Sequence, residues 1–179
     1  MSRFTVLLFI LFLMVGCTVK DKPVPQKTSS PPKISYYENE TVRYKVPITK
    51  DWTLKPPKEN ADMFIVSNDG SLSPDPSINI QSVETEKYDL WDKKSQAKII
   101  AEIDPKLKPA EQNNKTINGE RAYNLIYGFE KDGRSVIIDQ TYLFHNGYFI
   151  VITCSCREEE YNRFKEVFGK LINSIDFYK

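Results

Sequence analysis

The sequence predicts an α+β domain in which helices flank an antiparallel β-sheet. The first observation is a run of three strands within residues 121–153, joined by the short turns Lys131-Asp132-Gly133 and His145-Asn146-Gly147. Strands linked by such tight turns form an antiparallel meander. The second is a broad apolar stripe at helical spacing near the C-terminus, which should pack on the sheet. The third is a weaker helical pattern before the meander.

Four short strands are expected ahead of the meander. Residues 41–47 alternate between apolar and charged side chains, which is the period of a strand, and Pro47 should end it. The other three are expected at residues 52–55, 63–67 and 78–83. Asn68-Asp69-Gly70 supplies turn chemistry between the last two.

The first helix is expected to run from a cap at Asp89 to about Ile103. Asp92, three residues after the cap, suits the positive end of the helix dipole, and Pro105 stops the helix. The turn at residues 116–120 contains Asn-Gly, which readily adopts the positive φ angles of hairpins. The meander strands are then expected at residues 121–130, 134–144 and 148–153.

The last helix has the clearest signals. Ser155 and Glu158 have the spacing of a capping box, and three glutamates crowd the expected N-terminus. The apolar stripe consists of Tyr161, Phe164, Phe168, Leu171, Ile172 and Ile175. We expect this stripe to lie on the sheet rather than to form a cofactor or partner groove.

The N-terminus has the pattern of a signal peptide. Arg3 precedes an apolar run over residues 4–15, which is shorter than the roughly twenty residues that a helix needs to cross a bilayer. Met14-Val15-Gly16-Cys17 resembles the lipobox of bacterial lipoproteins. This resemblance implies cleavage before Cys17 and attachment of a diacylglycerol to its thiol, with ordinary secretion as the alternative. Thr18 after the cysteine permits the outer membrane if the organism is Gram-negative.

The chain therefore divides into three expected parts. Residues 1–16 are the signal peptide, residues 17–35 are the lipidated cysteine with a Pro/Lys-rich tether, and residues 36–179 are the globular domain. The tether has too few apolar residues to offset its ordering entropy. It would span roughly 25 Å as a coil and about 55 Å fully extended.

Composition argues against nucleic acid as a partner. Without Arg3, the 25 basic residues of the full chain become 24, which balance the 24 acidic ones. Neither a basic tract nor an aromatic RNA-binding motif is present.

Cys154 and Cys156, separated by one serine, are candidates for a thiol pair. They are expected near the start of the last helix, where a thiol can have a lowered pKa. A redox pair, a local disulfide and two ligands of a shared metal are conceivable roles, and structural cysteines are the leading interpretation. Two thiolates do not complete a four-ligand zinc site, so no metal is predicted. His145, the only histidine, is expected to be a solvated turn residue rather than a metal ligand or proton carrier.

The order of these pieces resembles the PsbP-like group, named for a lumenal extrinsic protein of photosystem II. The matching pieces cover most of residues 41–177 and include residues 42–52, Ile78-Asn79-Ile80, Ile117-Asn118-Gly119, residues 140–148 and the last helix. The resemblance implies an antiparallel sheet between helices, an α/β/α sandwich. It also implies non-enzymatic work, such as the assembly or stabilisation of a membrane complex.

The expected function is thus that of an exported, lipid-anchored binding or assembly module that contacts an unidentified envelope protein. We expect no enzymatic activity and no cofactor. Two alternatives are a thiol-dependent redox protein using Cys154 and Cys156, and a carrier of a small ligand or metal. Exposed aromatic residues such as Tyr36 and Trp91 are candidates for an interaction surface.

Overall fold

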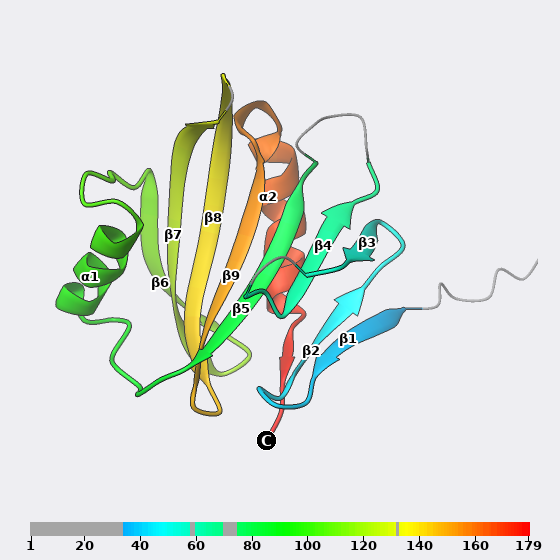
Figure 1. Ribbon diagram of the computed structural model, residues 1–179, viewed down its shortest axis with the longest axis horizontal. Helices are drawn as coiled ribbons and strands as arrows, with labels where there is room; N and C mark the ends of the chain where they lie inside the picture. Colours follow the sequence, from blue (N-terminus) through cyan, green and yellow to red (C-terminus); the bar gives the residue numbers. More distant parts are fainter. Residues whose placement is uncertain (1–33, 58–59, 70–74, 132) are drawn as a thin grey trace, which may run out of the picture. The chain divides into compact units, whose positions relative to one another are not determined.

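Two antiparallel sheets and two helices make up the domain in the computed structural model, which describes residues 34–57, 60–69, 75–131 and 133–179 (Figure 1). The helices are α1 (Lys93–Ile103) and α2 (Glu158–Asn173). The strands are β1 (Ser35–Asn39), β2 (Tyr44–Ile48), β3 (Trp52–Lys55), β4 (Met63–Ser67), β5 (Ser77–Glu84), β6 (Glu111–Ile117), β7 (Glu120–Lys131), β8 (Arg134–His145), β9 (Tyr148–Arg157) and β10 (Asp176–Phe177). The predicted α+β class is confirmed.

The larger sheet has the strand order β3-β4-β5-β9-β8-β7-β6, and the smaller one has the order β1-β2-β10. Every neighbouring pair is antiparallel, and β7, β8 and β9 form the predicted meander. Its second turn depends on positive φ angles, which residues other than glycine rarely adopt: Asn146 has φ 48° and Gly147 has φ 81°. The turn residues that predicted the meander are therefore required by its geometry.

The two helices cover opposite faces of the larger sheet, as the alternation along β9 shows. Ile150 and Ile152 point to the core that contains α2, together with buried residues of β4 and β5. Phe149 and Val151 point the other way, to a second cluster that contains Ile99 of α1. The expected α/β/α layering is thus confirmed for the larger sheet.

The capping box predicted at Ser155 and Glu158 is wrong. Strand β9 continues to Arg157, and Arg157 occupies the N-cap position of α2 without a side-chain hydrogen bond to the helix. The Ser155 hydroxyl instead lies 2.9 Å from that of Ser77 on the neighbouring strand β5. Three glutamates in the first turn still favour the helix dipole.

The predicted cap of the first helix is displaced by three residues. Asp92, not Asp89, is the N-cap of α1, and its carboxylate accepts a hydrogen bond of 2.9 Å from the backbone N–H of Ser95. Asp89 accepts from the Trp91 backbone N–H at 2.9 Å in the preceding turn. Both aspartates satisfy backbone donors, and only the second is followed by helix.

Pro47 does not end its strand, because it lies within β2 opposite Tyr36 of β1. On the other side of β2, strand β10 reaches only Tyr44 and Lys45, so Pro47 lies beyond that pairing, where a missing N–H is tolerated. The last helix was expected to run to Phe177, but α2 ends at Asn173 and residues 176–177 form β10, so Ile175 of the predicted stripe lies beyond the helix. Strands β1, β6 and β10 have no counterpart in the sequence-based prediction.

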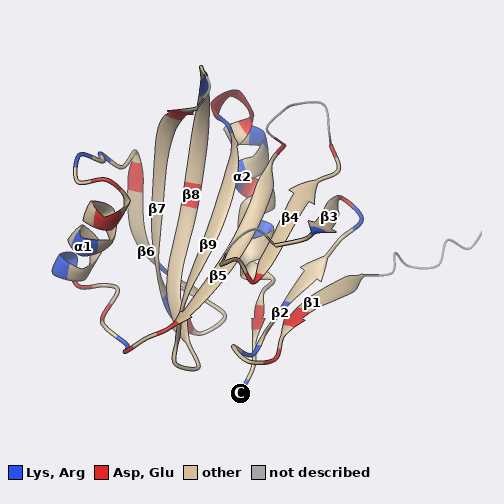
Figure 2. Ribbon diagram, in the orientation of Figure 1, with Lys and Arg blue, Asp and Glu red and all other residues tan. Residues whose placement is uncertain are grey.

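Charged residues lie mainly on the helices and at strand ends (Figure 2). The exception within the long strands is Asp139, in the middle of β8. Neither described helix is long and apolar enough to cross a membrane.

Candidate functional site: a groove along the last helix

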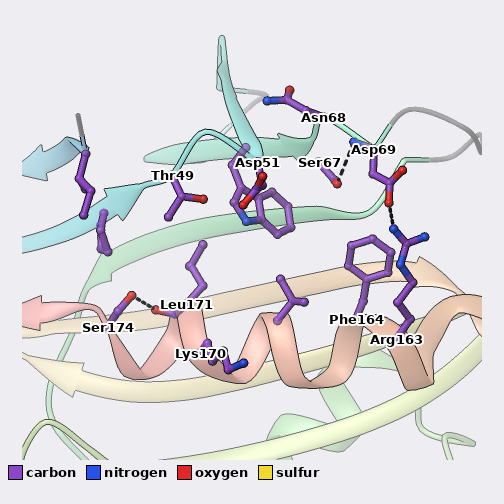
Figure 3. A pocket seen from close by; sticks show the side chains of 14 residues that line it. Thr49, Asp51, Ser67, Asn68, Asp69, Arg163, Phe164, Lys170, Leu171 and Ser174 are labelled. Carbon is purple, nitrogen blue, oxygen red and sulfur yellow. Dashed lines mark hydrogen bonds and ion pairs between the residues drawn. The ribbon is translucent and has the colours of Figure 1, made fainter. Parts of the chain in front are cut away.

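A groove of about 770 Å³ runs along α2, between this helix and the loops that flank β3 (Figure 3). We call it the α2 groove. It is lined by Ile34, Pro47, Thr49, Asp51, Trp52, Ser67, Asn68, Asp69, Arg163, Phe164, Val167, Lys170, Leu171 and Ser174. Its volume lies within the 300–1,000 Å³ that ligand sites in proteins commonly have.

One wall of the groove is a flank of α2. Its lining positions recur three and four residues apart, from Arg163 to Ser174, so they share one side of the helix. The neighbouring flank, which includes Phe168 and Ile172, is buried in the sheet core. Val167 lies on the groove flank and leaves 37% of its surface exposed, although it is a large apolar residue.

The floor is aromatic and fixed by the core. Trp52 of β3 is 6% exposed, and its ring centroid lies 6.4 Å from that of Phe168. The Phe164 ring lies 5.7 Å from the same phenylalanine. Because both rings are braced by Phe168, the floor keeps its shape when nothing is bound.

The opposite wall is held by hydrogen bonds around Asn68. Its side-chain N–H donates to the Lys50 carbonyl at 2.7 Å, its backbone N–H donates to the Asp51 carbonyl at 2.8 Å, and its side-chain oxygen accepts from the Thr53 hydroxyl. The Trp52 backbone N–H donates to the Thr49 carbonyl at 3.1 Å. These bonds tie the loop before β3 to the end of β4 and satisfy backbone groups along this wall.

The rims of the groove carry opposite charges. Arg163 and Lys170 lie on α2, whereas Asp51 and Asp69 lie on the loops across from it. Arg163 forms an ion pair with Asp69 at one end of the groove (Figure 3). Lys170 pairs with Glu166 one turn away at 2.7 Å, and both side chains are about three-quarters exposed. Such exposed pairs contribute little to the free energy of unfolding, so either side chain can form another ion pair at little cost.

A polar cluster is buried beneath α2, on the sheet side of the helix. Asp139 accepts a 2.6 Å hydrogen bond from the Asn124 side chain and a 3.3 Å bond from the Tyr161 hydroxyl. Burial lowers the pKa of nearby Lys115, and the charge of Asp139 opposes that change. This cluster connects β7, β8 and α2, so we interpret it as structural.

The two cysteines predicted as a possible thiol pair lie in strand β9, and both are buried on the side that faces α2. Burial, with the nearby charge of Asp139, raises the pKa of Cys154 well above its usual value. Burial, then the charges of Glu160 and Asp139, raises the pKa of Cys156 to about 12. The lowered pKa expected at a helix start is therefore wrong, because the thiols belong to the strand. Thiols in this state are weak nucleophiles.

His145 is a buried structural residue rather than the solvated turn residue that was expected. Its Nδ1 lies 3.0 Å from a Glu120 carboxylate oxygen, and its Nε2 lies 3.1 Å from the Tyr178 carbonyl oxygen. Its ring also packs against Phe177 at 5.1 Å between centroids. His145 thus connects the C-terminal segment to the meander.

Other sequence-based candidates contribute less. Cys17 lies outside the described residues. Tyr36 is exposed, whereas Trp91 donates its indole N–H to the Ala122 carbonyl at 3.0 Å and lies under the Arg121 guanidinium. In the described part of the chain, no three His, Cys, Asp or Glu side chains are placed together to hold a metal ion.

Sequence reasoning missed the groove because its walls come from distant segments, residues 34–69 and residues 163–174. Each wall alone has an ordinary pattern. One local signal was available: Val167 widens the apolar stripe of α2 beyond the width that one sheet contact needs.

Comparison with known proteins identifies the fold. No protein-family model and no curated protein sequence match the chain. The solution structure of cyanobacterial PsbP (CyanoP) from Synechocystis sp. PCC 6803 is similar with a TM-score of 0.62 at 13% identity, over 84% of this chain and 96% of that one.

Two further solved structures share the fold. LpqN from Mycobacterium tuberculosis, described as involved in cell envelope biogenesis, has a TM-score of 0.54 at 15% identity, over 85% of this chain and 88% of LpqN. A Pseudomonas aeruginosa protein, described as a putative regulator of unknown function, has a TM-score of 0.52 at 12% identity, over 82% and 98% of the two chains. The PsbP-like fold expected from the sequence is confirmed.

Proposed function

We propose that this PsbP-like chain is an exported lipoprotein, anchored through Cys17, that binds a membrane or envelope protein through the α2 groove and helps to assemble or stabilise its complex. The proposal is non-enzymatic. The observation that carries it is the groove itself: an apolar floor, rigid walls and a charged rim without a segment of the described chain to cover it.

The groove has the composition of a protein-binding site. Interfaces concentrate their affinity in a few aromatic and arginine residues surrounded by a polar rim. Trp52, Phe164 and Arg163 are residues of these types, and the four rim charges balance. Val167 and Ile34 both line the groove and leave 37% and 49% of their surfaces exposed, so the groove offers apolar surface to a partner.

The proposed anchor places this site near a membrane. Two acyl chains would hold Cys17 almost permanently. The tether expected over residues 17–35 reaches about 55 Å when extended, which limits how far Ile34 in the groove lining can lie from the bilayer surface. Membrane proteins with short extramembrane parts fall within this distance. LpqN, of the same fold, is described as involved in cell envelope biogenesis, which is compatible with such a role.

The anchor is tested by metabolic labelling with a radioactive fatty acid in cells that express the wild-type chain or Cys17→Ser. We expect label in the wild type and none in the variant. Label retained in Cys17→Ser would contradict lipidation at this cysteine.

Binding is tested by crosslinking in native membranes followed by mass spectrometry. We expect one reproducible partner for the wild-type chain, and loss of this partner for Val167→Glu, which places a charge on the groove floor. Val83→Glu is the matched control, since Val83 is 61% exposed on β5, on the sheet face opposite α2. Equal recovery of the partner by both variants would contradict the role of the groove.

A further inference from the structure

We propose that the occupant of the α2 groove is an amphipathic helix of the partner, about three turns long, whose apolar stripe is bordered by acidic residues on one side and basic residues on the other. This inference rests on the proposed function, because it names what the groove binds.

The length of the groove fits a short helix. Its lining on this side runs from Arg163 to the C-cap Ser174, a separation of eleven residues that rises about 16 Å at 1.5 Å each. A partner helix lying alongside would cover this distance in three turns. Helices bound in grooves present apolar anchors at positions i, i+3, i+4 and i+7, which extend over about 10 Å of backbone. The remaining length accommodates the side chains at either end.

The floor offers contacts for such anchors. Phe164, Val167 and Leu171 follow one another at spacings of three and four residues along α2. Trp52 completes the floor from the β3 side. Anchors that repeat at the same spacing can pack between these side chains as ridges pack into grooves.

The walls favour a helix over an extended segment. An extended peptide gains affinity from unpaired backbone groups at a sheet edge. Here one wall is a helix, whose backbone groups are paired internally. On the other wall, the carbonyls of Thr49, Lys50 and Asp51 already accept hydrogen bonds. A helix needs no such groups, since it satisfies its own backbone.

Charge complementarity defines the borders of the occupant. Lys170 on the α2 rim calls for acidic residues, and Asp51 on the opposite rim calls for basic ones. At the Arg163 end, the ion pair with Asp69 already joins the two rims. At the other end, Lys170 is bound only to Glu166 in an exposed pair, so it can turn to an incoming carboxylate at little cost.

The test uses three synthetic stapled helices that share four leucines at positions i, i+3, i+4 and i+7. The first has one acidic and one basic border, the second has two acidic borders, and the third has two basic borders. Binding to the full-length lipidated protein in lipid nanodiscs is followed by the fluorescence anisotropy of a labelled peptide. A helix with its two borders exchanged is not a valid control, because it can bind in the opposite direction along the groove. It would then present the same charges to the same rims.

We expect the mixed-border helix to bind the wild-type protein at least threefold more tightly than either of the others. This factor corresponds to the free energy of one exposed charge pair. Asp51→Lys makes the rim opposite α2 basic as well, so it should shift the preference to the helix with two acidic borders. Lys170→Glu should shift it to the helix with two basic borders. Val167→Glu should lower affinity at least tenfold, and Val83→Glu should not change it.

Several results would overturn the proposal. Failure of all three helices to bind would do so, as would equal binding of the three, or equal binding of an unstapled extended peptide that contains proline. Displacement of a bound helix by palmitate, with no effect of the rim variants, would indicate an acyl-chain site instead. A partner crosslinked in membranes together with failure of the helices would leave the proposed function intact and reject the helix. Bound helices without any crosslinked partner would reject the proposed function.

Discussion

The two flanks of α2 differ in a way that separates folding from binding. The flank that faces the sheet is closed: Phe168 and Ile172 are buried among residues of strands β2 to β9. The flank that faces the α2 groove carries Val167, which is 37% exposed, between Phe164 and Leu171, which are themselves buried at 5% and 6% exposure. The same helical spacing therefore serves two surfaces, and the described part of the chain covers only the first. Substitutions on the first should affect stability, and substitutions on the second should affect binding.

The largest effect is expected for Phe168→Ala. This ring supports both Trp52 and Phe164, and its removal leaves a cavity under the groove floor. We expect the free energy of unfolding to fall by about 3–5 kcal/mol, as for other buried phenylalanines. Unfolding in guanidinium chloride measures this, and a loss below about 1 kcal/mol would show that the closed flank is not the core of the domain.

A smaller loss is expected for Asp139→Ala in the polar cluster beneath α2. The substitution removes an acceptor from the Asn124 amide and from the Tyr161 hydroxyl, in a buried place. The loss of hydrogen bonds to a buried carboxylate costs about 1–3 kcal/mol. Glu111→Ala is the control, because Glu111 has an exposed ion pair with Lys165 that should contribute less than about 1 kcal/mol. Equal losses in the two variants would contradict the structural role of the cluster.

Stability should fall at alkaline pH because of the two thiols of β9, which are buried on the side that faces α2. Their pKa values are raised in the folded chain, for Cys156 to about 12, so only the unfolded chain ionises them above its ordinary thiol pKa of about 8.5. The stabilisation is complete below that pH and declines above it, by up to about 1.4 kcal/mol per thiol for each pH unit.

Guanidinium chloride unfolding between pH 7.5 and 10, in the presence of a reducing agent, measures this slope. The double variant Cys154→Ala/Cys156→Ala should start from a lower stability and show a shallower decline between pH 8.5 and 10. Parallel slopes for the variant and the wild type would mean that the thiols ionise in the folded chain, as a redox pair would need.

The smallest effect on stability is expected for Val167→Glu on the open flank. Surface substitutions usually change the free energy of unfolding by less than about 0.5 kcal/mol, and Val167 is already 37% exposed. The same substitution should abolish partner binding. Thermal unfolding and crosslinking of one protein preparation compare the two effects, and a loss of more than about 2 kcal/mol would assign Val167 to the core.

The elements that sequence reasoning predicted are those with strong local signals. The meander has glycine turns that its backbone requires, and α2 contains five of the six residues of the predicted apolar stripe. Strand β6 was missed because nearly all of its side chains are exposed and polar at an edge of the sheet, so no alternation marks it. Strand β10 pairs with β2 across a long sequence distance and is only two residues long, whereas β1 forms a hairpin with β2 but has no buried residue to mark it.

The errors near the cysteines have one cause. Ile152, Cys154 and Cys156 alternate with the polar residues of the second half of β9, which is strand periodicity. Ser155 with Glu158 also matched a helix start, and this shorter pattern was given precedence. The register of β9 against β5 and β8 decides for the strand, and a single sequence does not show that register. The groove depends on tertiary structure in the same way.

Site-specific photo-crosslinking tests the central claim most directly, that the open flank of α2 binds a partner helix. A benzophenone amino acid is placed at Val167 or at Val83 of the full-length chain in living cells, and the crosslinked peptides are sequenced by mass spectrometry. We predict one partner at Val167, joined through an apolar position of an amphipathic helix with one acidic and one basic border, and no such product at Val83. The same products from both positions, or none from Val167, would contradict the claim.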